Sequence, residues 1–259
     1  MIVVEGLTKR FGKVTAVDGL SFQVQPGEIV GLLGPNGAGK TTAMRCMCGI
    51  TPAQEGRVLI QGVDLDDDPV RAKSKLAFVP SEPRLFDYLT VQEHIGFFAR
   101  LYAAADGQAS REWIAEREAA GAALLAELDL AQRLDFLPGA LSRGMKQKLM
   151  IACALVHEPQ VLIFDEPFTG LDPHAIRKVR QIIQNHIGKG ACVMISSHLL
   201  GMVEDMITSA LIINRGRKVV EGNMDELRKN LSAEHQHADL EEIFIQLTSE
   251  APQIERVAP

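Results

Sequence analysis

Two hydrophobic patterns alternate along most of the chain, one typical of strands and the other of helices. Short, mostly apolar segments predict strands at residues 28–33, 75–79, 160–164, 191–196 and 210–214. The last three are compact and typical of parallel strands that are buried on both faces. Segments with helical periodicity lie between these predicted strands, at residues 40–48, 173–187 and 199–206. Strands that alternate with helices predict an α/β fold with a doubly wound, mostly parallel sheet.

The N-terminal part and the middle of the chain depart from this alternation. Residues 2–4 and 20–24 are rich in β-forming residues and are punctuated by glycines, so they predict an N-terminal antiparallel β subdomain; residues 57–60 predict another strand. From about residue 85 to 155 the β signal is weak, and helical patterns occupy residues 91–101 and 110–128. The apolar run at 150–156 suits a buried helix. The sequence therefore predicts an inserted α-helical subdomain over about residues 84–152.

The C-terminal segment has an amphipathic pattern of its own. Four apolar side chains there have the spacing of one helix face: Leu240, Ile243, Phe244 and Leu247. We divide the chain into a core domain over residues 1–230 and a C-terminal amphipathic helical tail over residues 231–259. The apolar face of the tail would pack on the same subunit or contact a partner. We interpret His235 and His237 as part of a solvated linker rather than as a metal site.

Composition narrows the class of protein and its location. The chain has 259 residues, of which 46% are hydrophobic and 23% charged, so it can bury a sizeable core. A formal net charge of −6 argues against bulk attraction to nucleic acid, and we expect no nucleic-acid partner. No run approaches the ~20 apolar residues that span a bilayer, and the N-terminus lacks the pattern of a secretory signal. We therefore expect a chain in the cytosol, with any membrane role supplied by a partner.

The four cysteines fit the same reducing compartment. None of them form a C-x-x-C pair, and all four lie in apolar segments: Cys46, Cys48, Cys153 and Cys192. A free cysteine in such a segment behaves as a small hydrophobic residue. We expect all of them to be buried and reduced.

Residues 34–41 match the phosphate-binding pattern G-x-x-x-x-G-K-[ST] in full. Glycines let the backbone curl around phosphate oxygens, and the helix that begins there adds the positive end of its dipole. Lys40 would reach the β- and γ-phosphates, and Thr41 would supply a hydroxyl to Mg²⁺. The residues that we expect to bind the nucleotide in this loop are Gly34, Pro35, Asn36, Gly37, Ala38, Gly39, Lys40, Thr41 and Thr42.

Two adjacent carboxylates, Asp165 and Glu166, follow the buried strand at residues 160–164. Sheets of this class bind ligands at the carboxyl ends of their strands. Asp165 suits a ligand of Mg²⁺ together with Thr41, and Glu166 is placed to polarise an attacking water. Farther along, Asp172 and Pro173 suit the N-cap and the first turn of a helix.

Residues 141–147, Leu-Ser-Arg-Gly-Met-Lys-Gln, are similar to the L-S-G-G-Q signature of ATP-binding cassette (ABC) transporters. They lie about 20 residues before the acidic strand end, and Gly-Leu-Asp-Pro at 170–173 and Ser-His at 197–198 follow it. The order of these motifs is that of the family, and the resemblance covers residues 2–230. The chain is identified as a member of this family. The resemblance implies a subunit that has a P-loop NTPase fold and binds ATP and Mg²⁺. The resemblance also implies integral-membrane permease subunits as partners, at the cytoplasmic side of the cell membrane.

The resemblance assigns contacts to ATP beyond the phosphate loop. Phe11 would stack on the adenine. Ser142 and Gly144 would contact the γ-phosphate held by a second ATP-binding subunit, because in this family the signature lies far from the phosphate loop of its own chain. Asp172 would link the two sites. ATP would thus close a head-to-tail dimer and hydrolysis would release it; whether the two subunits are identical stays open.

The catalytic residues that the resemblance implies are Lys40, Glu166 and His198. His198 would touch the γ-phosphate and help to position Glu166 and the water. The family usually has a glutamine that contacts Mg²⁺ after the strand at 75–79, where this chain has Ser81 with Glu82 beside it. The reach of serine is shorter, so direct metal contact by Ser81 is in doubt, and Glu82 or a water would substitute.

These departures keep two other classes open. Arg143 and Met145 replace a glycine and the glutamine of the signature, but its backbone and hydroxyl donors survive, so we expect function to survive. The change at Ser81 leaves room for a non-catalytic nucleotide-binding module. A soluble ABC-type ATPase of DNA repair or translation fits less well, because only about 100 residues separate Lys40 from Ser142 and the chain has one cassette.

Residues 81–93 join the core strand to the helical insertion and would couple ATP to the membrane partner. Their apolar members would form a groove for a cytoplasmic helix of that partner, or would simply pack the insertion: Leu85, Phe86, Tyr88 and Leu89. The L-S-x-G-M form of the signature and the segment 240–244 are most like exporter-type subunits. The membrane subunits choose the transported substrate, so this sequence does not specify it.

Overall fold

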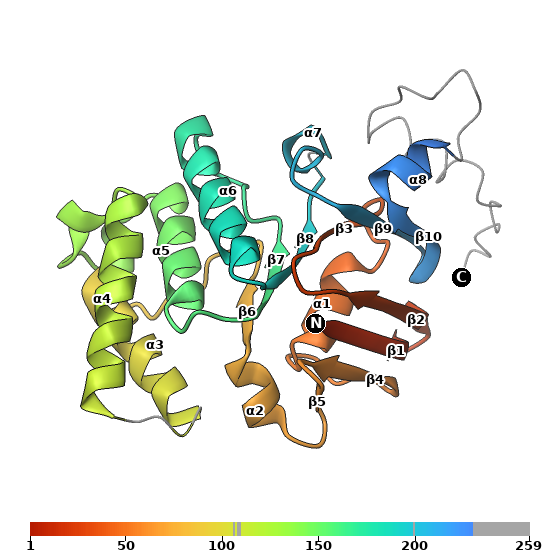
Figure 1. Cartoon of the computed structure of the whole chain (residues 1–259), viewed down its shortest axis with the longest axis horizontal. Coiled ribbons are helices and arrows are strands. Elements are labelled where there is room, and N and C mark those ends of the chain that lie inside the picture. Colours follow the sequence, from red (N-terminus) through yellow and green to blue (C-terminus); the bar gives the residue numbers. More distant parts are fainter. Residues whose placement is uncertain (106, 108–109, 199, 230–259) are drawn as a thin grey trace.

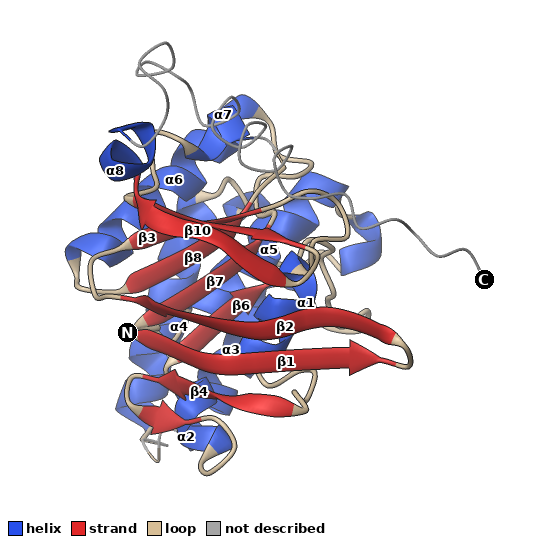
Figure 2. Cartoon of the chain, turned by 90° about the vertical axis from the view of Figure 1, so that its right-hand side faces the viewer, coloured by secondary structure: helices blue, strands red, loops and turns tan. Residues whose placement is uncertain are grey.

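The chain forms two β-sheets with helices packed around them (Figures 1 and 2). The structure, a computed structural model, describes residues 1–105, 107, 110–198 and 200–229. The central sheet has six strands in the order β10-β9-β3-β8-β7-β6, and all neighbours are parallel except β9 and β10. Its strands are β3 (Ile29–Leu33), β6 (Leu76–Val79), β7 (Val161–Asp165), β8 (Cys192–Ser196), β9 (Ser209–Asn214) and β10 (Arg217–Asn223).

The central sheet separates two hydrophobic cores, which explains why its inner strands are apolar without interruption. In β3, Ile29 and Leu33 belong to what we call the first core, whereas Val30 and Leu32 belong to the second core. The same alternation continues in β7, β8 and β9, because successive side chains of a strand point to opposite faces of the sheet. Both faces are covered, as is usual for a parallel sheet.

The N-terminal antiparallel sheet predicted from the sequence contributes to the second core, together with α1 (Lys40–Met47). Its four strands follow the order β2-β1-β4-β5, with the bounds β1 (Ile2–Phe11), β2 (Val14–Val24), β4 (Glu55–Ile60) and β5 (Val63–Asp64). Figure 1 shows α1 beside this sheet, behind the two long strands β1 and β2. These strands pair as a hairpin in which Phe11 lies opposite Val14.

Between β6 and β7 the described residues form the predicted helices and no strand. They are α3 (Val91–Ala105), α4 (Arg111–Glu127) and α5 (Arg143–Leu155), with 3-10 turns at Ala131–Arg133 and Pro138–Ala140. Figure 1 shows these helices grouped on one side of the molecule, away from the N-terminal sheet. The remaining helices are α2 (Pro69–Ser74), α6 (Pro173–Gly188), α7 (Leu200–Val203) and α8 (Met224–Lys229).

Two expectations from the hydrophobic pattern need correction. The pattern does not predict β10, because this edge strand is mostly exposed and carries no apolar run. The helix expected at residues 199–206 is only the short α7, which ends before Glu204 and Asp205; acidic residues are unfavourable at the C-terminal end of a helix dipole. The amphipathic tail at 231–259, with His235 and His237, lies outside the described residues.

The cysteine prediction is confirmed, since all four are free and buried. Burial raises the pKa of the Cys48 and Cys153 thiols well above the usual range, so they stay protonated and act as small apolar groups. In the described part of the chain, no helix is both long and apolar enough to cross a membrane.

The first core should be sensitive to cavities. Ile183 of α6 is fully buried there, so Ile183→Ala should lower the free energy of unfolding by about 2–5 kcal/mol. The matched change at the exposed Ile50 (56% exposed) should alter it by no more than about 0.5 kcal/mol. Chemical denaturation of both variants measures the difference, and equal effects would contradict this assignment of the core.

Candidate nucleotide-binding site

The phosphate loop connects β3 to α1, and two of its glycines are fixed by close backbone contacts. A Cβ atom on Gly39 would lie 2.2 Å from the carbonyl oxygen of Ala16, and the φ angle of Gly39 is 103°. A Cβ atom on Gly34 would lie 2.4 Å from the carbonyl oxygen of Ile213. Distances this short exclude any side chain, so the glycines let the loop fit between β2 and β9.

The N-terminus of α1 is left without a side-chain cap. Gly39 occupies the N-cap position, and the first turn contains no acidic residue. By contrast, α5 and α6 are capped by Ser142 and Asp172. The unsatisfied N–H groups and the dipole of α1 therefore make this end suitable for an anionic ligand.

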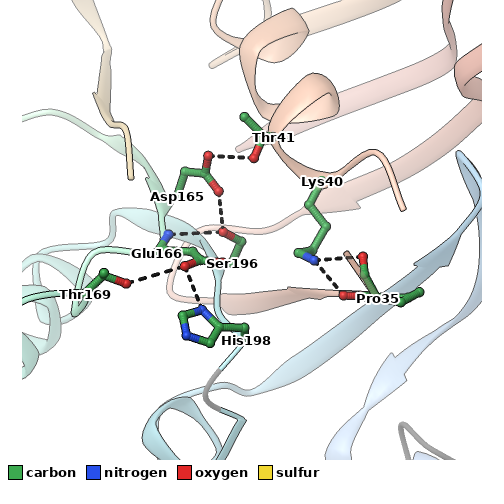
Figure 3. Close-up of polar contacts among 9 residues, drawn as sticks. Pro35, Lys40, Thr41, Asp165, Glu166, Thr169, Ser196 and His198 are labelled. Carbon is green, nitrogen blue, oxygen red and sulfur yellow. Dashed lines mark hydrogen bonds and ion pairs between the residues drawn. The ribbon is translucent and has the colours of Figure 1, made fainter. Parts of the chain in front are cut away.

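Lys40 is nearly buried, and its ammonium turns back on the loop. Its Nζ donates to the carbonyl oxygens of Gly34 at 2.6 Å and Pro35 at 3.2 Å (Figure 3). Burial lowers the pKa of Lys40, and the nearby carboxylates of Glu166 and Asp165 oppose that shift. Phosphate oxygens would be stronger partners for this ammonium than the two carbonyls.

The carboxylates at the end of β7 form a hydrogen-bonded network with the phosphate loop and with β8 (Figure 3). Thr41 Oγ1 donates to Asp165 Oδ2 at 2.9 Å, and Ser196 Oγ donates to Asp165 Oδ1 at 2.6 Å. The same Ser196 hydroxyl accepts from the backbone N–H of Glu166 at 3.1 Å. Asp165 is 2% exposed, so these contacts replace the water that a buried carboxylate loses.

Glu166 and His198 contact each other at the mouth of this network. His198 Nδ1 lies 2.7 Å from Glu166 Oε2, which also accepts a long hydrogen bond of 3.4 Å from Thr169 Oγ1. The φ angle of Glu166 is 52°, a left-handed value that is strained for a residue with a side chain. The surrounding contacts hold the carboxylate in this orientation, which is a feature of many active sites.

A cleft of about 440 Å³ joins the loop to Glu166. Beside Glu166, it is lined by Val14, Thr15, Ala16, Asn36, Gly37, Ala38, Gly39, Lys40, Thr41, Thr42 and Arg215. Most of the phosphate-loop residues predicted from the sequence therefore come together here. Ser142, Gly144 and Asp172 do not line this cleft, and their roles stay predictions.

Thr41 and Asp165 fit a magnesium ion, since both offer hard oxygen ligands at one point. Mg²⁺ commonly uses one or two carboxylates together with phosphates and water rather than an all-protein cage. Over the residues that the structure describes, no group of three or more His, Cys, Asp or Glu side chains could hold a metal. Ser81 is half-buried just after β6, and no hydrogen bond joins it to Thr41 or Asp165.

Phe11 and Asp172, which are also predicted to take part in the nucleotide site, lie outside the cleft lining. Phe11 is 53% exposed at the end of β1, with the Lys9 ammonium 4.9 Å from its ring centroid. An exposed ring beside the cleft strands is available for stacking. Asp172 accepts from the N–H groups of His174 and Ala175 at 2.9 Å each, which holds its pKa below the usual range and confirms the N-cap prediction.

Sequence reasoning missed two residues at the site. Ser196 is fully buried and lies in register with Asp165 on the neighbouring parallel strand, a contact that needs the strand order. Arg215 lines the cleft from the turn between β9 and β10, where its φ angle is 50°. Because β10 was not predicted, nothing in the sequence pattern located this turn.

Together the loop, the acidic strand end and the cleft define a P-loop nucleotide-binding site. Residues 17–169 match the family model for ABC transporters. Over 250 residues the chain is 34% identical to the ABC-type transporter ATP-binding protein EcsA of Bacillus subtilis, covering 96% of this chain and 97% of that protein. The chain belongs to the ABC transporter family, as one of its ATP-binding proteins.

Other relatives carry the same cassette in longer proteins. The chain is 36% identical to the probable multidrug ABC transporter ATP-binding protein YbhF of Escherichia coli, over 95% of this chain but 41% of that protein. It is 37% identical to the Nod factor export ATP-binding protein I of Burkholderia thailandensis, over 83% of this chain and 68% of that protein.

Solved structures agree with the fold. An ATP-binding subunit of an ABC transporter superposes with a TM-score of 0.87 at 34% identity, over 96% of this chain and 99% of that chain. A dimeric ATP-binding cassette bound to ADP and Pi has a TM-score of 0.74 at 22% identity, over 86% and 99% of the two chains, which supports the fold alone. The predicted P-loop NTPase fold and family are thereby confirmed, while the roles of individual residues stay predictions.

Removal of the Lys40 ammonium should strongly impair hydrolysis of ATP. Lys40→Ala should lower Mg-ATP turnover about 100-fold or more, because the variant loses the only lysine that lines the cleft among the described residues. Lys189→Ala, at an exposed ion pair with Glu158, is the control and should keep normal turnover. A phosphate-release assay on both variants makes the comparison, and unchanged turnover in Lys40→Ala would contradict the site.

Proposed function

We propose that this chain hydrolyses ATP with Mg²⁺ and thereby powers export through separate integral-membrane permease subunits. The observation that carries this proposal is the network at the carboxyl end of β7, where Thr41, Asp165, Ser196, Glu166 and His198 are joined by hydrogen bonds opposite Lys40. A module that only binds nucleotide would not need an oriented carboxylate and histidine at this position. The network therefore favours the catalytic reading over a non-catalytic one.

Each residue of the network would have one task in hydrolysis. Lys40 would exchange its two loop carbonyls for β- and γ-phosphate oxygens, while Thr41 and Asp165 would hold Mg²⁺. Mg²⁺ would supply charge neutralisation to the phosphate oxygens when bound. Glu166 would accept a proton from the attacking water as general base, and His198 would orient the Glu166 carboxylate through the 2.7 Å contact.

The catalytic arrangement would be completed by a second ATP-binding subunit. Ser142 is exposed at the N-terminus of α5, where its Oγ accepts from the N–H of Met145. Its hydroxyl and the N–H groups that this cap does not engage would be donors for a phosphate. Because Ser142 and Gly144 do not line the cleft of their own chain, they would close over the nucleotide of the partner. ATP would favour the closed dimer, and hydrolysis would remove that preference.

An exposed apolar surface supports docking of a membrane partner. Tyr88 is 92% exposed and Phe86 is 49% exposed, whereas the neighbouring Leu85 packs against the first core. Phe86 also packs edge-on against Phe97 of α3, with ring centroids 5.0 Å apart, so its exposed half and the Tyr88 ring are the parts that would contact a partner. A hollow of about 480 Å³ begins in the same segment at Thr90.

Buried His94 holds this segment in shape. Its Nε2 accepts from the backbone N–H of Phe86 at 3.0 Å, and its Nδ1 donates to the carbonyl oxygen of Thr90 at 2.7 Å. Burial lowers the pKa of His94, so the ring stays neutral and can make both contacts. A pre-formed loop would dock a cytoplasmic helix with a smaller loss of conformational entropy.

Export is supported by the relatives and by the signature. Two of the relatives described above are named for multidrug transport and Nod factor export, and the L-S-x-G-M form of residues 141–145 is typical of such subunits. The chain would work at the cytoplasmic side of the cell membrane through the permease. A soluble ABC-type ATPase of repair or translation is not supported by any of these relatives.

The dimer model predicts a stable ATP-bound state when hydrolysis is blocked. Glu166→Gln removes the general base but keeps the size of the side chain, so Mg-ATP should convert the variant from monomer to dimer. Size-exclusion chromatography with and without Mg-ATP measures this change. The double variant Glu166→Gln with Ser142→Arg is the control and should stay monomeric; a Glu166→Gln variant that stays monomeric as well would contradict the model.

A charge on the proposed docking surface should uncouple transport from ATP. Tyr88→Asp should lower transport, in vesicles that contain the permease, about tenfold or more, because an aspartate at an apolar contact must lose its water. Affinity for ATP should stay within about twofold, since Tyr88 does not line the nucleotide cleft. Val70→Asp is the control, because Val70 is also an apolar residue on the surface (59% exposed). Equal transport by the two variants would argue against the docking surface.

A further inference from the structure

Gln147 of α5 is almost completely buried, with 1% of its surface exposed, although it belongs to the signature helix. Its Nε2 donates to the carbonyl oxygen of Pro167 at 3.2 Å. Pro167 directly follows Glu166 in the chain. The side chain thus crosses from the helix that carries the signature to the loop that carries the proposed general base.

A second contact ties the same two segments together one helical turn earlier. A Cβ atom on Gly144 would lie 2.7 Å from the carbonyl oxygen of Gly170, so the start of α5 and the loop after Glu166 are in close backbone contact. Gly144 and Gln147 are three residues apart and therefore lie on one face of α5. The loop between Pro167 and Gly170 is held against that face at both of its ends.

The Glu166–Pro167 segment needs such support. The φ angle of Glu166 is 52°, and a residue before proline has few favourable backbone conformations. On one side, the backbone N–H of Glu166 is held by Ser196 Oγ at 3.1 Å. On the other side, Gln147 is the side chain that binds the carbonyl of Pro167 in the described structure.

We propose that Gln147 is a positioning residue that transmits the engagement of the signature to Glu166 of the same chain. This inference rests on the proposed function. When Ser142 and Gly144 grip the γ-phosphate of the partner's nucleotide, α5 is fixed, and Gln147 and Gly144 fix the loop that begins at Pro167. Glu166 then adopts its working orientation at the chain's own nucleotide. Each active site would thus be assembled only when its chain has also closed over the other site.

The Oε1 atom of Gln147 gives a clean way to test this role. That atom is buried and makes no hydrogen bond within the described residues. Methionine has nearly the same shape and lacks both polar atoms, so Gln147→Met removes the donor to the Pro167 carbonyl. The loss of this partner for the carbonyl is offset by removal of the unpaired Oε1 atom. We expect the melting temperature to change little.

Steady-state hydrolysis should separate positioning from binding. Gln147→Met should lower kcat for ATP about tenfold and leave KM within about twofold of the wild type. Gln181→Met makes the same chemical change at an exposed glutamine on α6, and both constants should stay normal. A normal kcat in Gln147→Met overturns the inference, whereas a wild-type chain without turnover overturns the proposed function and the inference with it.

Dimer formation distinguishes positioning of Glu166 from simple support of α5. In the Glu166→Gln background, the added Gln147→Met change should leave the Mg-ATP-dependent dimer intact, because the grip of Ser142 and Gly144 does not need the orientation of residue 166. Size-exclusion chromatography compares the two variants at equal concentration. If Gln147→Met abolishes the dimer as well as turnover, its role is support of the signature helix, and the inference is wrong.

Discussion

The side-by-side order of β3, β8 and β7 is the constraint on which the site depends. These strands are parallel, so their carboxyl ends meet at one edge of the sheet. This edge brings together the loop after β3, the carboxylates after β7 and the serine at the end of β8. The register that pairs Asp165 with Ser196 lets one hydroxyl bind the Asp165 carboxylate and the Glu166 backbone. A shift of one residue would turn these side chains to the opposite face.

The two cores make that edge rigid. Alternate residues of each inner strand enter different cores, so the sheet is packed from both sides and its strands cannot slide without disturbing both. The helical insertion packs into the first core through α5, and the N-terminal sheet packs into the second. Both subdomains thereby hold fixed places relative to the central sheet, which the proposed roles of Ser142 and Phe11 require.

The sequence predicted the fold well where segments are mostly apolar and motifs are local. The mostly apolar segments located β3, β6, β7, β8 and β9, and the phosphate loop and the N-cap at Asp172 follow from neighbouring residues alone. It failed at β10, an exposed edge strand without a hydrophobic run, and at Arg215 in the turn before it. Ser196 and Gln147 could not be assigned, because each acts through a residue distant in sequence, and only the strand order and the packing of α5 bring the partners together.

The hydrogen bonds of Lys40 to its own loop influence how much free energy is gained when this ammonium binds phosphate. A buried ammonium without partners would be strongly unfavourable, but the carbonyl oxygens of Gly34 and Pro35 accept its hydrogen bonds. The phosphate oxygens of a nucleotide therefore compete with these two carbonyl oxygens for the Lys40 ammonium. The contribution of Lys40 to nucleotide affinity is the difference in free energy between the two sets of hydrogen bonds. In the proposed reaction, the same two carbonyls would again accept the ammonium once product has left, so no other group of the chain would be needed to balance the Lys40 charge between turnovers.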